Sequence, residues 1–269
     1  MKRVRFDKDS KKRKISKRLD KLYKQDHIPV LPYDMLNEIF SYLGSDDLRT
    51  CACVCSSWNN HISNILKYDC VFICDITKSM STHWKHLINT MNMCFNTYNK
   101  FRYGFIGYSE HSYTSQCIQR FDLTYNTEKL KDKIENLKLA EGNDYPEAVH
   151  DGLYTALNMN WNTKNKKICI LVCDAPPHGI EYNNDASDDT DTSSIRYIDT
   201  YPNGCPCGLN IEFILRTFMY KHISLAILYT DLRVKTMVKI FEKIYPNIFS
   251  VYIKKNTFEI PVTHLLTNF

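Results

Sequence analysis

The sequence lacks any long apolar run and contains little glycine or proline. Its best apolar stretch, residues 168–173, is strand-sized and falls far short of the roughly 20 residues that a membrane-spanning helix needs. Only 8 Gly and 9 Pro among 269 residues exclude collagen-like and low-complexity chains. No apolar stretch follows the basic N-terminus, so no secretory signal peptide is expected. These absences predict a cytoplasmic protein that has no membrane partner.

Basic charge is also missing from the body of the chain, although the formal net charge is +5. Residues 1–26 hold 12 Lys or Arg and 4 Asp or Glu, whereas the remaining residues hold 23 basic and 26 acidic side chains. A nucleic-acid-binding domain carries its positive charge on the folded body, so nucleic acid is not an expected partner. The segment 1–26 is predicted to be disordered, and to act either as a solubilising leader or as a nuclear-import or polyanion-binding patch.

Signatures of catalysis are absent as well. The sequence contains no Gly-rich phosphate loop, no set of protein-kinase motifs and no Cys/His spacing of a RING finger. An aspartyl-phosphate loop built on Asp75 would need a second aspartate two positions later, where the chain has Thr77. The chain is therefore expected not to be an enzyme. A metal-dependent phosphohydrolase is the weaker alternative, and hydrolysis that disappears on Asp75→Ala would support it.

The 11 cysteines are an odd number in a chain without a signal peptide, so reduced thiols are expected rather than a disulfide framework. Cys51, Cys53 and Cys55 are spaced two apart on a predicted helix and point to different sides. They therefore cannot converge on a tetrahedral zinc ion. Cys205 and Cys207, with His178 upstream, are an alternative candidate for a metal cluster.

From residue 69 onward, patterns typical of strands and helices alternate. In the predicted strand at 167–174, residues 168–173 are apolar without alternation, as expected for a central parallel strand that is buried on both faces. The fold class is therefore predicted to be α/β, with a doubly wound, mostly parallel sheet over 68–269 and an acidic loop near 180–203. Strands are expected at 69–75, 102–108, 113–121, 167–174, 223–229 and 248–253, and helices at 83–97, 127–137, 145–159, 209–220 and 233–244.

Residues 27–67 form a separate segment, within which three short helices are expected from residue 29. Pro32 suits the first turn of a helix, and Leu36, Ile39 and Phe40 lie at helical spacing on one apolar stripe. About forty residues cannot enclose a core unaided, so the stripe is expected to need a partner surface.

This segment resembles the F-box through Leu31-Pro32, Asp47-Leu48 and the final Val54-Cys55-x-x-Trp58. The resemblance implies docking onto the Skp-type adaptor of a cullin–RING ubiquitin ligase, in a helix-in-groove contact made by exposed apolar anchors. The alternative is a helical cap packed on the sheet domain. The residues expected to bind the adaptor are Leu31, Pro32, Leu36, Ile39, Phe40, Leu43, Leu48, Val54 and Trp58.

A polar motif directly follows the first predicted strand of the sheet. Asp75, Thr77 and Ser79 can place three oxygen atoms on one side of a loop at the carboxyl end of that strand. Doubly wound sheets bind their ligands at this edge. A carboxylate and two hydroxyls suit a hard cation such as Mg²⁺, which accepts few protein ligands and keeps several waters.

Together with two later acids, this motif resembles the von Willebrand factor A domain and its metal-ion-dependent adhesion site. Asp144 takes the place of the family's second-loop threonine, as in the subgroup found beside alpha-type kinases, and Asp174 matches the third-loop aspartate. The resemblance implies that Mg²⁺ or Mn²⁺ is held by Asp75, Thr77, Ser79 and Asp144, with Asp174 bound directly or in the outer shell. An Asp or Glu of a target protein would complete the octahedron.

Three positions depart from the subgroup. Glu141 and Asn143 stand where glycine is usual, and Cys205 stands where an aspartate is common. These departures leave open a degenerate domain whose acids only cap helices and loops. His178, next to the predicted site, either tunes its rim or caps a loop.

The combined interpretation is a substrate-recruiting F-box adaptor of a cullin–RING ubiquitin ligase that captures an unknown target protein through a metal-dependent A-type domain. The alternative is a metal-dependent protein-binding scaffold without a ligase role. Abundant Lys, Asn, Ile and Tyr indicate an A/T-rich genome. An F-box fused to this A-domain subgroup resembles gene content of large DNA viruses of amoebae, in which case the host's ligase would be used. The expected location is the cytoplasm, or the nucleus if the basic segment acts as an import signal.

Overall fold

The computed structural model describes residues 32–43, 45–65, 67–111, 117–142, 144–182 and 199–254, together with Phe258 and Val262. The chain divides into two compact units, the first ending at Ile62 and the second beginning at Ser63. The predicted basic tail, Leu31 and most of the predicted acidic loop lie outside the described residues. Among the described residues, no helix has both the length and the apolar character needed to cross a bilayer.

The first unit contains three helices, as expected: α2 (Tyr33–Ser41), α3 (Ser45–Ala52) and α4 (Ser56–Ile65). Pro32 directly precedes α2 with a φ of −51°, and its carbonyl oxygen accepts a hydrogen bond from Leu36 N at 3.1 Å. The ring of Phe40 is buried and meets the Trp58 ring edge-on, with centroids 5.2 Å apart. The apolar stripe of α2 therefore forms a small interior between α2 and α4.

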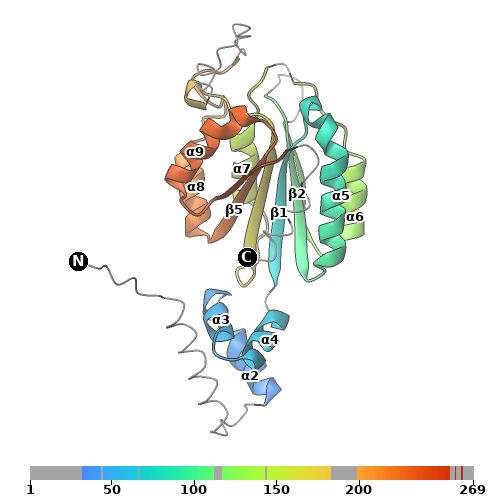
Figure 1. Ribbon diagram of the computed structural model, residues 1–269, viewed down its shortest axis with the longest axis vertical. Helices are drawn as coiled ribbons and strands as arrows, with labels where there is room; N and C mark the ends of the chain where they lie inside the picture. Colours follow the sequence, from blue (N-terminus) through green and yellow to red (C-terminus); the bar gives the residue numbers. More distant parts are fainter. Residues whose placement is uncertain are drawn as a thin grey trace, which may run out of the picture. The chain divides into compact units, whose positions relative to one another are not determined.

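The second unit is built on a six-stranded sheet with the order β3-β2-β1-β4-β5-β6 (Figure 1). The pairs β1/β2, β1/β4, β4/β5 and β5/β6 are parallel, and only β3 runs antiparallel to its neighbour. This topology confirms the predicted mostly parallel α/β sheet. The strands are β1 (Tyr68–Asp75), β2 (Phe101–Tyr108), β3 (Ile118–Thr124), β4 (Lys166–Cys173), β5 (Ile223–Tyr229) and β6 (Phe249–Tyr252).

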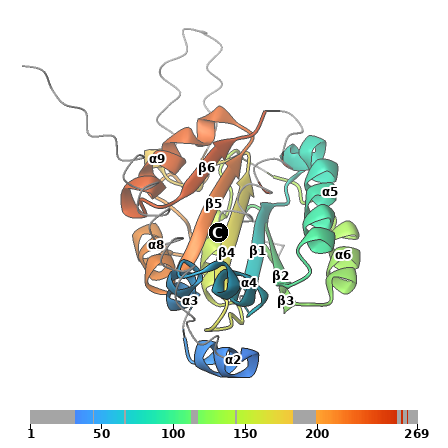
Figure 2. The same cartoon turned by 60° about the horizontal axis from the view of Figure 1, so that its bottom comes forward.

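Helices cover both faces of this sheet, α5 and α6 on one side and α7, α8 and α9 on the other (Figures 1 and 2). Alternate side chains of β1 serve the two layers: Val71 and Ile73 pack toward α7–α9, and Phe72 packs toward α5 and α6. Burial on both faces explains why the central strands show no polar alternation. The helices are α5 (Ser81–Thr97), α6 (Thr127–Glu135), α7 (Val149–Leu157), α8 (Ile211–Tyr220) and α9 (Lys235–Ile244).

Two predicted elements begin four or more residues later than the sequence indicated. The helix expected from residue 145 starts at Val149, because Glu147 forms a parallel β-bridge with Pro177 and its backbone is therefore extended. Glu147 N and Ala148 N donate to Pro176 O and Ser109 O in neighbouring loops. The strand expected at 113–121 is β3, which begins at Ile118; residues 113–116 lie outside the described residues. The first shift matters for function, because it leaves residues 144–148 as a loop at the edge of the sheet.

A candidate cation site at the carboxyl edge of the sheet

The first loop of the site follows β1 and is organised by Asp75. This residue is fully buried, and its Oδ1 accepts hydrogen bonds from Thr77 N at 2.8 Å and Thr77 Oγ1 at 2.6 Å. Thr77 Oγ1 lies 2.9 Å from Ser79 Oγ. The three residues of the predicted motif are therefore adjacent, and Asp75 fixes the direction of the Thr77 hydroxyl.

Backbone hydrogen bonds bring two further loops to the first. Ala140 N donates to Ile76 O at 2.7 Å, and Lys78 N donates to Ala140 O at 2.9 Å. Glu147 N donates to Pro176 O at 2.9 Å, which joins the second loop to the one that follows β4. The loops after β1, before α7 and after β4 therefore meet, as parallel strands with their carboxyl ends at one edge allow.

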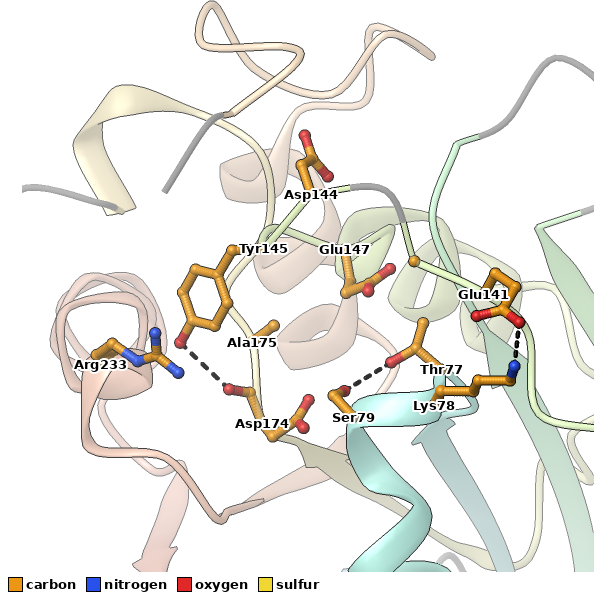
Figure 3. Close-up of a pocket in the computed structure, with 11 residues that line it drawn as sticks. Thr77, Lys78, Ser79, Glu141, Asp144, Tyr145, Glu147, Asp174, Ala175 and Arg233 are labelled. Carbon is orange, nitrogen blue, oxygen red and sulfur yellow. Dashed lines mark hydrogen bonds and ion pairs between the residues drawn. The ribbon is translucent and has the colours of Figure 1, made fainter. Parts of the chain in front are cut away.

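The three loops enclose a pocket of about 250 Å³ (Figure 3). Four of the five predicted metal ligands line it: Thr77, Ser79, Asp144 and Asp174. Asp75 is not among the lining residues, and it reaches the pocket through its hydrogen bonds to Thr77. The other residues that line the pocket are Lys78, Glu141, Gly142, Tyr145, Glu147, Ala175 and Arg233.

Buried carboxylate oxygens without a hydrogen-bond partner among the described residues distinguish this pocket. They are Asp75 Oδ2, Asp144 Oδ1, Glu147 Oε2 and Asp174 Oδ1. An unpartnered buried carboxylate is costly, and buried polar groups in folded proteins are almost always satisfied. Three of these residues line the cavity and the fourth, Asp75, is hydrogen-bonded to Thr77 of its lining, and such a set fits a hard cation, which is held by oxygen ligands. The residues present therefore fit the Mg²⁺ or Mn²⁺ that the sequence predicts.

The protonation of these acids follows from their burial. Burial raises the pKa of Asp75 well above its ordinary value, and the neighbouring Asp174 carboxylate raises it further. Burial likewise raises the pKa of Asp174. For Glu147, burial together with the charges of Asp75 and Glu110 raises the pKa to about 11. Without a cation the pocket therefore holds protons at neutral pH, and a bound cation would favour the ionised forms.

Cationic side chains stand at the rim of the pocket. The Arg233 guanidinium lies over the Tyr145 ring, 4.1 Å from its centroid, and Tyr145 Oη donates to the Asp174 carbonyl oxygen at 3.2 Å. Lys78 forms an exposed ion pair with Glu141, the residue that replaces a glycine of the subgroup (Figure 3). The Arg233 guanidinium is also paired with Asp231, so both rim cations already have an acidic partner within the chain.

Sequence reasoning missed Glu147 and Arg233 as pocket residues. Glu147 carried a signal, because it lies only three positions after Asp144, the predicted ligand of the second loop. Arg233 carried none, because the loop after β5 reaches the pocket only through the order of strands in the sheet.

His178 belongs to a network that holds the rim. Its Nδ1 lies 2.8 Å from Asp199 Oδ1, and the Asp199 carboxylate also accepts hydrogen bonds from Gly179 N and Tyr201 N, each at 2.9 Å. Thr200 N donates to Asp144 Oδ2 at 2.6 Å, which leaves Asp144 Oδ1 for the pocket. His178 therefore caps a loop, one of its two predicted roles.

The predicted adaptor-binding residues of the first unit separate into two groups. Leu36, Phe40 and Leu48 are buried, which corrects the expectation that they are exposed, and their part in adaptor binding stays a prediction. Pro32, Ile39 and Val54 are exposed, whereas Leu43 and Trp58 are half-buried. Helical spacing shows which residues share one apolar side of a helix, but it does not show which of them pack against neighbouring helices and which stay exposed.

Replacing Glu147 with glutamine is expected to stabilise the metal-free protein, increasingly so as the pH rises. The folded protein holds the Glu147 proton up to a pKa of about 11, whereas the unfolded chain releases it near the ordinary value of 4.5. The unfolded state therefore binds fewer protons between these values, and stability falls with rising pH by up to about 1.4 kcal/mol per pH unit. Glutamine removes this contribution. Thermal unfolding in a chelating buffer between about pH 6 and pH 8 measures the difference.

The matched control for this prediction is Glu212→Gln, because Glu212 is exposed on α8 and pairs with Arg216. This variant should follow the pH dependence of the wild type. Equal pH slopes for Glu147→Gln and the wild type would contradict the assignment of Glu147 as a buried, protonated acid.

Comparisons with known proteins agree with both resemblances. Residues 64–265 match the family model described as Mediator complex subunit 25 von Willebrand factor type A, and residues 28–73 match the model described as F-box-like. The alpha-protein kinase vwkA of Dictyostelium discoideum is 25% identical over 162 residues, which cover 58% of this chain and 24% of that protein. The chain thus spans about a quarter of the length of this curated relative. The relative's name, alpha-protein kinase, agrees with the predicted subgroup of A domains, which is found beside alpha-type kinases.

Proposed function

The chain belongs to the family described as Mediator complex subunit 25 von Willebrand factor type A, with an F-box-like segment at residues 28–73, and on this premise we propose that it recruits substrates to a cullin–RING ubiquitin ligase. The F-box-like unit binds the Skp-type adaptor, and the A-type domain captures the target protein. The chain itself is not an enzyme in this proposal, and ubiquitin transfer belongs to the assembled ligase. A viral source remains a prediction from composition.

The observation that carries the ligase role is the surface of the first unit. Four large apolar side chains are exposed there: Met35 (50%), Ile39 (44%), Tyr42 (81%) and Val54 (46%). Met35, Ile39 and Tyr42 follow one another at spacings of four and three residues, so they lie on one side of α2 and its last turn. Such a row is the arrangement by which an amphipathic helix enters an apolar groove.

Target capture is assigned to the pocket of the A-type domain. Asp75, Thr77, Ser79, Asp144 and Asp174 would hold Mg²⁺ or Mn²⁺ there, and the cation would supply an open coordination position for a carboxylate of the target. Asp75 orients the Thr77 hydroxyl through its 2.6 Å hydrogen bond. An acidic group of the target would approach past Arg233 and Lys78, which line the pocket and are paired with Asp231 and Glu141.

Reconstitution of the complex tests this proposal. The full chain is mixed with the Skp-type adaptor and the cullin–RING subunits, and co-elution on size exclusion is compared between the wild type and a Pro32→Ala/Ile39→Ala/Val54→Ala variant of verified fold. Co-elution of the wild type but not the variant supports the ligase role. If neither co-elutes, the ligase role is wrong, and a metal-dependent protein-binding scaffold becomes the better account.

A further inference from the structure

A second group of metal-ligating side chains lies outside the pocket described above. It consists of His111, Asp151, Cys205 and Cys207, each of which offers one ligand atom within 4.8 Å of the others. They come from different parts of the fold: His111 follows β2, Asp151 lies in α7, and the cysteines precede α8. We propose that these four residues bind a structural Zn²⁺ ion.

The separations between the ligand atoms agree with such a site. His111 Nε2 lies 3.0 Å from Asp151 Oδ2 and 3.4 Å from Cys205 Sγ, and Cys205 Sγ lies 3.2 Å from Asp151 Oδ2. Cys207 Sγ lies 3.9 Å from the other ring nitrogen, His111 Nδ1. Ligands about 2.0–2.3 Å from a tetrahedral zinc ion are separated from one another by about 3.3–3.8 Å. A rotation of the Cys207 side chain or of the imidazole would therefore be needed to place one ring nitrogen and both thiols around the ion.

The backbone around the cysteines is shaped to present both thiols. Gly204 N donates to Tyr201 O, and Gly208 N donates to Cys205 O, each at 3.0 Å, so one tight turn precedes the pair and another encloses it. Gly204 and Gly208 have φ values of +108° and +65°, which side chains other than glycine rarely adopt. The Cys-Pro-Cys segment is thus held in place by two glycine turns.

The donor set selects zinc over the cation of the neighbouring pocket. Thiolate and imidazole ligands suit Zn²⁺, whereas Mg²⁺ prefers oxygen ligands and retains its waters. Four protein ligands leave no open position, which is typical of structural rather than catalytic zinc. The His111 and Asp151 side chains are only 10% and 12% exposed, whereas Cys207 is exposed, so the site is buried on one side and open to solvent on the other.

Zinc binding would exchange protons for the metal. Each of the two thiols releases its proton to the buffer as a sulfur–zinc bond forms, and the His111 imidazolium, which is paired with Asp151, releases a third proton to coordinate as the neutral imidazole. The ion would then join the end of β2, helix α7 and the segment before α8. This segment also carries Thr200, whose backbone N–H donates to Asp144, so the zinc site anchors the loop that borders the pocket.

Zinc titration of the full chain tests the proposal. Protein stripped of metal under reducing conditions is titrated with Zn²⁺, and bound metal is counted by mass spectrometry. The wild type is expected to bind one equivalent, and Cys205→Ser or Cys207→Ser should weaken binding by at least about tenfold. Cys53→Ser, which removes an exposed thiol from the first unit, should leave binding unchanged. Asp174→Asn should also leave it unchanged, which separates this site from the proposed magnesium pocket.

A second measurement on the wild type avoids reliance on folded variants. Zinc should protect Cys205 and Cys207 from alkylation, while the exposed Cys53 reacts equally with and without zinc. Co²⁺ in place of Zn²⁺ should give the intense visible bands of a tetrahedral site with thiolate ligands. Absence of a bound equivalent, or unchanged alkylation of both cysteines, would overturn the proposal and leave a hydrogen-bonded cluster without metal.

Discussion

Replacing Ile39 with aspartate is expected to abolish capture of the Skp-type adaptor, with affinity falling at least about 100-fold. Ile39 is 44% exposed on α2, between the exposed Met35 and Tyr42. An aspartate there would place an unpaired charge in the centre of an apolar contact, where side chains contribute most to binding. Because Ile39 is not part of the buried set Leu36, Phe40 and Leu48, the fold should survive the change. Calorimetry or surface plasmon resonance with purified adaptor measures the affinity.

The matched control is Phe213→Asp, since Phe213 is an exposed apolar residue of α8 in the second unit. It should bind the adaptor like the wild type. Trp58 is less suitable as a test position, because its ring packs on the buried Phe40 and its loss would disturb the helices themselves. Undiminished adaptor binding by Ile39→Asp would refute the assignment of this surface.

Removal of the Asp174 carboxylate is expected to eliminate most of the stabilisation that Mg²⁺ confers. At a Mg²⁺ concentration about 100 times the dissociation constant, the wild type gains about 2.7 kcal/mol from binding. A variant with affinity about 100-fold weaker gains only about 0.4 kcal/mol at the same concentration. Asp174→Asn is expected to weaken Mg²⁺ binding by this factor, because the proposal makes Asp174 a metal ligand. Asp174 Oδ1 has no hydrogen-bond partner among the described residues. Thermal unfolding with and without Mg²⁺ measures both gains.

The sign of the effect reverses in the absence of metal. Burial and nearby acids raise the pKa of both Asp75 and Asp174. Without metal, these two carboxyl groups therefore destabilise the folded state relative to the unfolded state. Asp174→Asn should therefore be at least as stable as the wild type in chelator, and less stable in Mg²⁺. Asp122→Asn is the control, because Asp122 is an exposed acid of β3 paired with Arg120. An equal Mg²⁺-induced shift in the wild type and Asp174→Asn would exclude Asp174 as a ligand.

The features that could be predicted from the sequence are local or periodic. Asp75, Thr77 and Ser79 lie within five positions of one another, and their hydrogen bonds connect residues two apart. Residues 168–173 of β4 are an uninterrupted apolar segment, and β5 (Ile223–Tyr229) has the predicted bounds. Such signals survive in a sequence because local backbone geometry and burial on both faces act on neighbouring residues.

The remaining features depended on which distant segments the fold brings together. Glu147 and Arg233 enter the pocket from separate loops, and His111 meets Cys205 across 94 positions of the chain. The sequence suggested His178 as the partner of the two cysteines, but the structure pairs His178 with Asp199 and places His111 beside the thiols. Strand order decides these neighbours: the carboxyl ends of β1, β2, β4 and β5 share one edge, so side chains far apart in sequence converge only after the sheet has formed.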